Sequence, residues 1–190
     1  MNNSNILIIA NDIFENDSKY SNRMIEYCKV LVNVAHVFMI PIRYDWSNNI
    51  NEKKIKEIGV KLLFPRFNST KYLLKFVLKN EIGTILFGSC NNIPEFSWIL
   101  PFFETVIVDG MDTVSSKKKG IETVRNIEYL RKADIVVASS VTEKDAINKI
   151  LPVKKIMVIP IDKNQRDSNK CNSCAVEQKI LKLFDRSYGA

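Results

Sequence analysis

Short, nearly continuous apolar runs alternate along the chain with longer stretches in which apolar residues recur every three or four positions. The runs predict seven strands, over residues 5–10, 35–42, 60–64, 83–88, 105–110, 134–139 and 155–161. The recurring positions predict helices over residues 18–34, 70–80 and 120–132, a short lysine-rich helix before Gly59, and a helix with a capping-box-like start at Thr142 and Asp145. Because the strands are almost entirely Val, Ile, Leu and Phe, both faces of the sheet are expected to be covered. The predicted fold is therefore α/β, a single Rossmann-like, doubly wound and mostly parallel sheet of about seven strands.

The chain divides into one domain and a tail. Its 190 residues suit a single domain, expected over residues 1–161. Residues 162–175 are polar and without periodicity, which is typical of a linker. Residues 176–190 regain an apolar helical face, so a final helix is expected to dock back on the domain. No run approaches the roughly 20 apolar residues that cross a bilayer, and no basic segment precedes the first run, so a cytoplasmic location is expected.

Several classes of function lack their signature in this sequence. The turn after the first strand, NDIFENDS, has no glycine to let a dinucleotide approach, and there is no Walker A motif. No nucleotide cofactor is therefore expected. The residues that a phosphorelay receiver needs at the ends of its third and fifth strands are not in place. His36 is the only histidine and stands at the end of the sheet opposite the expected ligand crevice, which excludes a Ser-His-Asp triad.

The cysteines and the net charge limit which metals and partner molecules are expected to bind. Cys28 and Cys90 lie in apolar surroundings and are expected to be buried thiols. Cys171 and Cys174 form a C-x-x-C in the polar tail, but no second Cys/His pair exists to complete a zinc site, so no metal is expected. The net charge of +7 suits anionic lipid or a phosphorylated substrate. Nucleic acid is not an expected partner, because the basic residues lack interleaved aromatics and any helix-turn-helix pattern.

Polar residues follow most of the predicted strands, where ligands of a doubly wound sheet bind. Residues 89–92 are among them. The candidates for substrate binding are Asn11, Asp12, Arg66, Ser89, Asn91, Ser139 and Ser140. Asp109 and Asp112 are the candidate catalytic residues, as a base, as hydrogen-bond acceptors or as metal ligands; the alternative is a turn in which they bind backbone amides. Ser139 and Ser140 equally suit the cap of the next helix.

Three lysines at four-residue spacing, Lys71, Lys75 and Lys79, form a basic stripe on the otherwise apolar helix over residues 70–80. Such a stripe suits an anionic membrane surface, although the general rule for amphipathic helices favours a core helix whose lysine face is solvated. The stripe therefore makes the cytoplasmic face of a membrane a candidate partner.

The stretch RKADIVVASSVTEKDAINKILPVKKIMVIPI resembles the end of the N-terminal domain of GT-B glycosyltransferases, in particular the retaining family 4 or group 1 type. The matching positions are Glu122, Glu128, Arg131, Ala133, Asp134, Ser139, Ile159 and Pro160. VNVAHVFMIPI is similar to the second strand of that family, and TVIVDGMDT to the segment that holds acceptor-side polar residues. The chain departs from the family in its first loop, which lacks glycine, and at Ile161, where the family has an Asn-Gly pair after the proline.

The resemblance implies one half of a GT-B fold, the acceptor-binding half, without the donor-binding domain. Each half of such an enzyme supplies part of the transition-state environment, so the isolated chain is expected to be inactive and to need a donor-binding glycosyltransferase subunit as partner. The alternative is a non-catalytic binding or assembly module of the same fold, which would form homo-oligomers. A small independent enzyme acting on a phosphorylated metabolite is a third interpretation, which the glycine-poor first loop disfavours.

Overall fold

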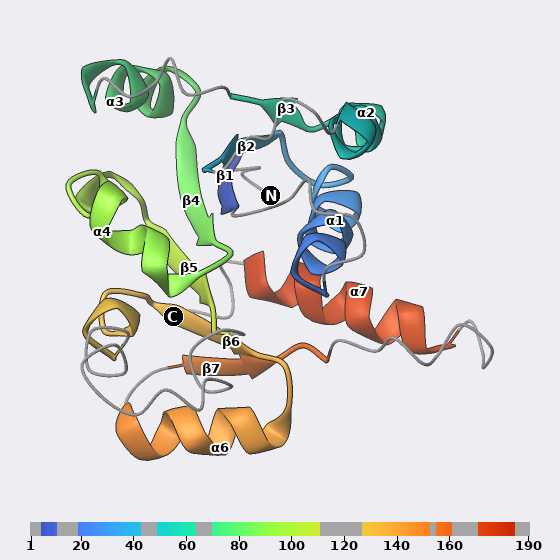
Figure 1. Ribbon diagram of the computed structural model, residues 1–190, viewed down its shortest axis with the longest axis vertical. Coiled ribbons are helices and arrows are strands. Elements are labelled where there is room, and N and C mark those ends of the chain that lie inside the picture. The colour runs from blue at the N-terminus through green and yellow to red at the C-terminus, as the bar shows by residue number, and fades with distance from the viewer. Residues whose placement is uncertain are drawn as a thin grey trace.

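A computed structural model describes residues 5–10, 19–42, 49–63, 70–110, 127–152, 155–160 and 171–184. Its centre is one sheet of seven strands, all parallel, with helices on both faces (Figure 1). The strands are β1 (Asn5–Ala10), β2 (Val37–Pro41), β3 (Lys61–Leu62), β4 (Ile82–Phe87), β5 (Thr105–Asp109), β6 (Ile135–Ala138) and β7 (Lys155–Val158). This confirms the predicted α/β, Rossmann-like domain, with the sheet wholly rather than mostly parallel.

The helices lie between successive strands and after the last one. They are α1 (Lys19–Leu31), α2 (Asn49–Ile58), α3 (Thr70–Lys79), α4 (Ile93–Phe96), α6 (Val141–Ile150) and α7 (Cys171–Phe184), with short 3₁₀ turns η2 (Cys90–Asn92) and η3 (Leu100–Phe102). Residues 127–130 are also helical and belong to the helix expected over 120–132, whose remaining residues up to 126 lie outside the described part. Within the described residues, none of these helices is both long and apolar enough to cross a bilayer.

The strand order is β3-β2-β1-β4-β5-β6-β7. The chain first builds outward from β1 through β2 to β3, and then returns to the other side of β1 to continue with β4. Neighbouring strands that are reached by crossovers in opposite directions leave a crevice between their carboxyl ends. The carboxyl ends of β1 and β4, where Ile9 lies beside Phe87, are therefore the switch point of this sheet.

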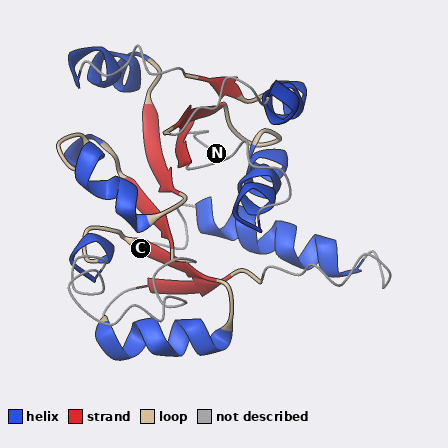
Figure 2. Ribbon diagram, in the orientation of Figure 1, coloured by secondary structure: helices blue, strands red, loops and turns tan. Residues whose placement is uncertain are grey.

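An apolar core lies on each face of the sheet, because successive residues of a strand face opposite sides. On β1, Leu7 and Ile9 enter one core while Ile6 and Ile8 enter the other, and all four are at most 2% exposed. Helices α3, α4 and α6 cover the first core, whereas α1, α2 and α7 cover the second. Figure 2 shows the strands enclosed between these two groups of helices.

Helix α7 packs on the domain through its apolar face. Ile180 and Leu183 are each 2% exposed and lie in the core that also contains Met24 of α1. Residues three positions apart on a helix share a face, which explains why these two are buried together. The helix begins at Cys171, five residues before its expected start, so it takes in the end of the stretch expected to be a linker.

Two expected boundaries differ from the structure. The third strand is reduced to Lys61–Leu62 because it forms the edge of the sheet and pairs with β2 alone. The helix expected to start at Thr142 starts at Val141, and Ser140 is its N-cap. The strand before it ends at Ala138, earlier than expected, which moves the cap toward the N-terminus.

Candidate functional site

The carboxyl edge of the sheet collects five of the predicted site residues. Ser89 and Asn91 follow β4, Asp109 ends β5, and Ser139 and Ser140 follow β6. These three strands are consecutive neighbours in the sheet, so the side chains share one edge. The other predicted residues of the crevice lie outside the described residues, and they are Asn11, Asp12, Arg66 and Asp112.

Asp109 lies in a buried cluster with Arg23 and Tyr27 of α1. On β5, Ile107 faces the core beneath α1, so Asp109, two residues further, faces α1 as well. The Tyr27 hydroxyl donates a 3.0 Å hydrogen bond to Asp109 Oδ2, and Arg23 Nε forms an ion pair with the same oxygen. Arg23 Nε also donates to the Tyr27 hydroxyl, at 3.2 Å. All three residues are at most 6% exposed.

The same arginine reaches a third element of the fold. Arg23 Nη1 donates a 3.0 Å hydrogen bond to the backbone oxygen of Ile159, just past the end of β7. Arg23 thus ties α1 to the carboxyl ends of β5 and β7. This contact fixes the position of α1 above the edge at which ligands of this fold bind.

The electrostatics of the cluster favour a neutral tyrosine and a charged arginine. Burial, and then the charge of Asp109, hold the pKa of Tyr27 well above its ordinary value, so its hydroxyl stays a donor. Burial lowers the pKa of Arg23, but Tyr27 and Asp109 outweigh that effect and raise it overall. Asp109 therefore serves as the counter-ion of Arg23 in this structure, and the catalytic role of Asp109 and Asp112 stays a prediction.

Two buried donors at this edge have no acceptor among the described residues. They are Nη2 of Arg23 and Nδ2 of Asn92. A buried donor without a partner costs about 1–3 kcal/mol, and native proteins carry few of them. Arg23 belongs to the helix that follows β1 and Asn92 to the turn that follows β4, so the two flank the switch point. They are the groups in the described part best placed to donate to a ligand oxygen.

The turn after β4 separates two adjacent asparagines. Ser89 is fully buried, and its Oγ accepts a 3.3 Å hydrogen bond from the backbone N–H of Asn91. The side chain of Asn91 is exposed, whereas Asn92 is 5% exposed. Asn92 is therefore the buried asparagine of this turn, whereas substrate binding by Ser89 and Asn91 stays a prediction.

Ser139 and Ser140 both bind Glu143. The Ser140 Oγ accepts a 3.1 Å hydrogen bond from the backbone N–H of Glu143. The Glu143 carboxylate in return accepts from the backbone N–H and the hydroxyl of Ser139. This reciprocal arrangement is a variant of the capping box in which the glutamate binds the residue before the N-cap, and it replaces the box expected at Thr142 and Asp145. Substrate binding by the two serines stays a prediction.

Replacing the N-cap tests this arrangement. Ser140→Ala is expected to lower the free energy of unfolding by about 1 kcal/mol, because the N–H of Glu143 loses its acceptor. Thr142→Ala, at the originally expected cap, should change it by less than about 0.5 kcal/mol. Urea denaturation of the two variants makes the comparison, and a larger loss for Thr142→Ala would contradict the assignment.

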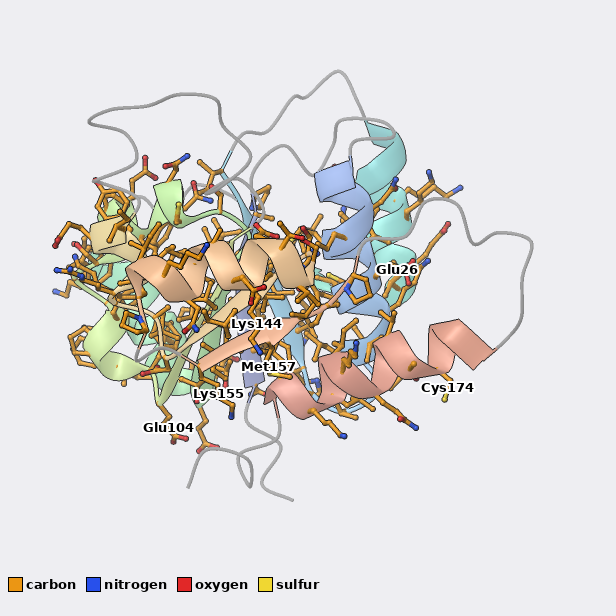
Figure 3. The ribbon with its side chains drawn as sticks, turned by 90° about the horizontal axis from the view of Figure 1, so that it is seen from below. Glu26, Glu104, Lys144, Lys155, Met157 and Cys174 are labelled. Carbon is orange, nitrogen blue, oxygen red and sulfur yellow. The ribbon has the colours of Figure 1, made fainter. Side chains whose placement is uncertain are left out.

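The cysteines fall into two environments. Cys28 and Cys90 are buried thiols, as predicted, and Cys174 is exposed. Figure 3 shows Cys174 on the outer side of α7, pointing away from the sheet. Burial raises the pKa of the Cys28 thiol to about 12 from the ordinary value of 9.0.

The buried thiol predicts a loss of stability in alkali. Because the folded-state pKa is raised, the contribution of Cys28 is fully present below pH 9.0 and is lost as the pH rises toward about 12. Between these limits the slope of unfolding free energy against pH should be shallower in Cys28→Ala than in the wild type, by about 1.4 kcal/mol per unit. Denaturant titrations at pH 8 to 10.5 measure both slopes, and equal slopes would contradict the prediction.

His36 stands apart from this edge. Its side chain is exposed, and its backbone oxygen accepts from Ile6 N at the amino end of β1. In the part of the chain that the structure describes, no three His, Cys, Asp or Glu side chains gather into a metal-binding group.

Comparison with known proteins shows which solved structures this fold resembles. No family model matches the sequence, and no curated protein matches it. Among solved structures, the chain is similar to HepE of Anabaena in complex with UDP and glucose, with a TM-score of 0.61 and 12% identity. The likeness establishes a Rossmann-like fold. It covers 93% of this chain and 50% of HepE, so the chain spans half the length of that protein.

Two further solved structures are more distant. UDP-glucose-4-epimerase of Stenotrophomonas maltophila, with NAD and formylated UDP-arabinopyranose, has a TM-score of 0.32 and 13% identity over 73% of this chain and 38% of its own. Leucoanthocyanidin reductase of Vitis vinifera, with NADPH, has a TM-score of 0.36 and 7% identity over 94% of this chain and 87% of its own.

Proposed function

We propose that this domain is the acceptor-binding half of a GT-B glycosyltransferase and acts with a donor-binding domain, on the same polypeptide or on a partner chain. The observation that carries the proposal is the fold likeness of 93% of the chain to half of HepE, a protein solved with UDP and glucose. The resemblance of residues 131–161 to the end of the N-terminal GT-B domain supports the acceptor side.

The chemistry of the carboxyl edge also favours an acceptor over a nucleotide. The described groups there include the buried hydroxyl of Ser89, the amide of Asn92 and the carboxylate of Glu143. Sugar hydroxyls donate to carboxylates and accept from amides, so these groups suit a saccharide. A diphosphate instead needs cations or exposed backbone N–H groups, and Arg23 already has Asp109 as its counter-ion.

The reaction requires two tasks, and we assign one of them to each domain. The leaving nucleoside diphosphate must be neutralised as the glycosidic bond forms, and we assign that task to the donor-binding domain. This domain would hold the acceptor hydroxyl, with Asn92 Nδ2 as a donor to an acceptor oxygen and the Arg23–Asp109 pair fixing the wall of the crevice.

The test measures whether the chain alone binds nucleotide sugars and releases the nucleoside diphosphate from them. UDP-glucose and GDP-mannose are titrated by calorimetry, and release of the nucleoside diphosphate is followed with and without saccharide acceptors. We expect Kd values weaker than about 1 mM, a free energy of only about −4 kcal/mol, and no release. Micromolar binding accompanied by release of the diphosphate would refute the proposal, because the chain would then be a complete transferase.

The second candidate function is a non-catalytic assembly module. The observation that favours it is β7, an outermost strand whose Ile156, Met157 and Val158 are only half-buried. Exposed apolar edge strands tend to pair with other chains. Size-exclusion chromatography with light scattering distinguishes the two candidate functions. A stable homo-oligomer that Met157→Lys converts to a monomer favours the assembly module. A wild type that is already a monomer favours the acceptor-binding half.

A further inference from the structure

Helix α3 turns a mixed basic and apolar face away from the domain. Leu73 and Val77 are buried in the core, which fixes the rotation of the helix. The opposite side, which we call the outward face of α3, consists of Lys71, Tyr72, Lys75, Leu78 and Lys79. Tyr72 and Leu78 are 65% and 57% exposed, although each is a large apolar side chain. Figure 1 shows α3 at an outer corner of the ribbon, at the opposite end from α6.

The lysines of this face differ from three lysines of α1 and α2. On α1 and α2, Lys29, Lys53 and Lys56 are paired with glutamates three or four positions away. Helix α3 contains no aspartate or glutamate. Within the described residues, no carboxylate lies in salt-bridge distance of its three lysines. The outward face therefore presents three positive charges for which the described part of the domain supplies no carboxylate partner.

A surface that combines uncompensated lysines with exposed apolar side chains matches one chemistry in particular. An anionic bilayer offers phosphates for the lysines and an acyl boundary for the apolar side chains. Tyrosine is suited to that boundary, since it has an apolar ring and a polar tip. A soluble anion or a nucleic acid would use the charges but leave Leu78 in water.

We propose that the outward face of α3 docks the domain on an anionic lipid surface, with the helix axis parallel to the membrane. Tyr72 and Leu78 enter the headgroup–acyl boundary, while Lys71, Lys75 and Lys79 contact lipid phosphates. This inference does not depend on the proposed function, because it rests on the side chains of the outward face of α3 alone.

Vesicle flotation tests the docking. The chain is mixed with vesicles of phosphatidylcholine alone or with 30% phosphatidylglycerol, at low and high salt. The wild type should float with the anionic vesicles only, and less at high salt. Because each lysine near an anionic surface is worth roughly fivefold in affinity, the triple variant Lys71→Gln, Lys75→Gln and Lys79→Gln should bind about 100-fold more weakly.

A matched control separates this face from net charge. Lys53→Gln, Lys54→Gln and Lys56→Gln remove the same three charges from exposed positions of α2, and this variant should lose less than about threefold. Tyr72→Ser with Leu78→Ser should weaken binding to anionic vesicles by about tenfold or more at unchanged charge. All of the substituted positions are exposed, so circular dichroism should show that the variants fold like the wild type.

Three results would overturn the proposal. The first is a wild type that fails to float with anionic vesicles. The second is an equal loss in the α2 and α3 lysine variants, which would indicate attraction by net charge alone. The third is binding of duplex DNA that depends on the α3 lysines while the Tyr72 and Leu78 variant floats like the wild type, which would identify a nucleic-acid surface instead.

Discussion

Arg23→Met is expected to lower the free energy of unfolding by about 3–5 kcal/mol. The substitution keeps much of the apolar stem but leaves the carboxylate of Asp109, which is 1% exposed, without its counter-ion. It also removes the hydrogen bond to the backbone of Ile159 that ties α1 to the end of β7. A buried charge that loses its ion-pair partner is among the few changes that cost this much in a single substitution.

A double-mutant cycle measures the pair itself. Asp109→Asn alone leaves the Arg23 charge buried and is expected to destabilise by a similar amount. The double variant carries neither charge, so its loss should be smaller than the sum of the single losses by about 2 kcal/mol or more. Replacing a buried ion pair as a whole is far less costly than breaking it.

The control for this cycle is the exposed pair of Arg131 and Glu128, whose side chains are 59% and 61% exposed. Arg131→Met should change the free energy of unfolding by less than about 1 kcal/mol, because exposed pairs contribute little. Urea denaturation at neutral pH gives all four values. Additive losses in the cycle, or an Arg23→Met loss no larger than that of Arg131→Met, would show that the buried cluster does not hold the fold.

The second large effect concerns α7. Leu183→Ala and Ile180→Ala should each lower the free energy of unfolding by about 2–5 kcal/mol, because both side chains are 2% exposed and their removal leaves cavities against the core of α1. Lys179→Ala, at an exposed position of the same helix, should change it by less than about 0.5 kcal/mol. If the two buried positions behaved like Lys179, then α7 would not be part of the folded domain.

The sequence predicted the sheet well because its central strands are buried on both faces. In β1 every buried residue is apolar, and in β4 Thr84 is the one buried polar residue, so the runs alone indicate parallel strands. At the edges tertiary pairing decides the length, which is why β3 is shorter than the apolar run that predicted it. The start of α6 was missed because the local sequence offers two overlapping capping boxes, and the end of the preceding strand selects the one at Ser140.

The sequence predicted that polar residues follow the strands at the carboxyl edge of the sheet, but it did not predict their contacts. The alternation along β5 could have placed Asp109 beneath α1, since Ile107 is two residues earlier. Arg23 lies on the apolar face of α1, four residues before Tyr27, and a charged residue on such a face signals a buried partner. Which residue is the buried partner of Arg23 could be seen only from the fold, because Asp109 is 86 positions further along the chain. The choice between Asn91 and Asn92 depends on the rotation of a 3₁₀ turn, which the two identical residues do not encode.

The most direct test of acceptor binding at the switch point is an amide NMR titration of the chain with a panel of neutral and phosphorylated saccharides, in parallel with UDP-glucose. The account predicts that saccharides shift the resonances of Ser89, Asn92 and Gly110, and that Asn92→Leu abolishes these shifts without unfolding the chain. UDP-glucose should leave the same resonances unchanged at equal concentration. Shifts caused by UDP-glucose alone, with none from any saccharide, would contradict the account.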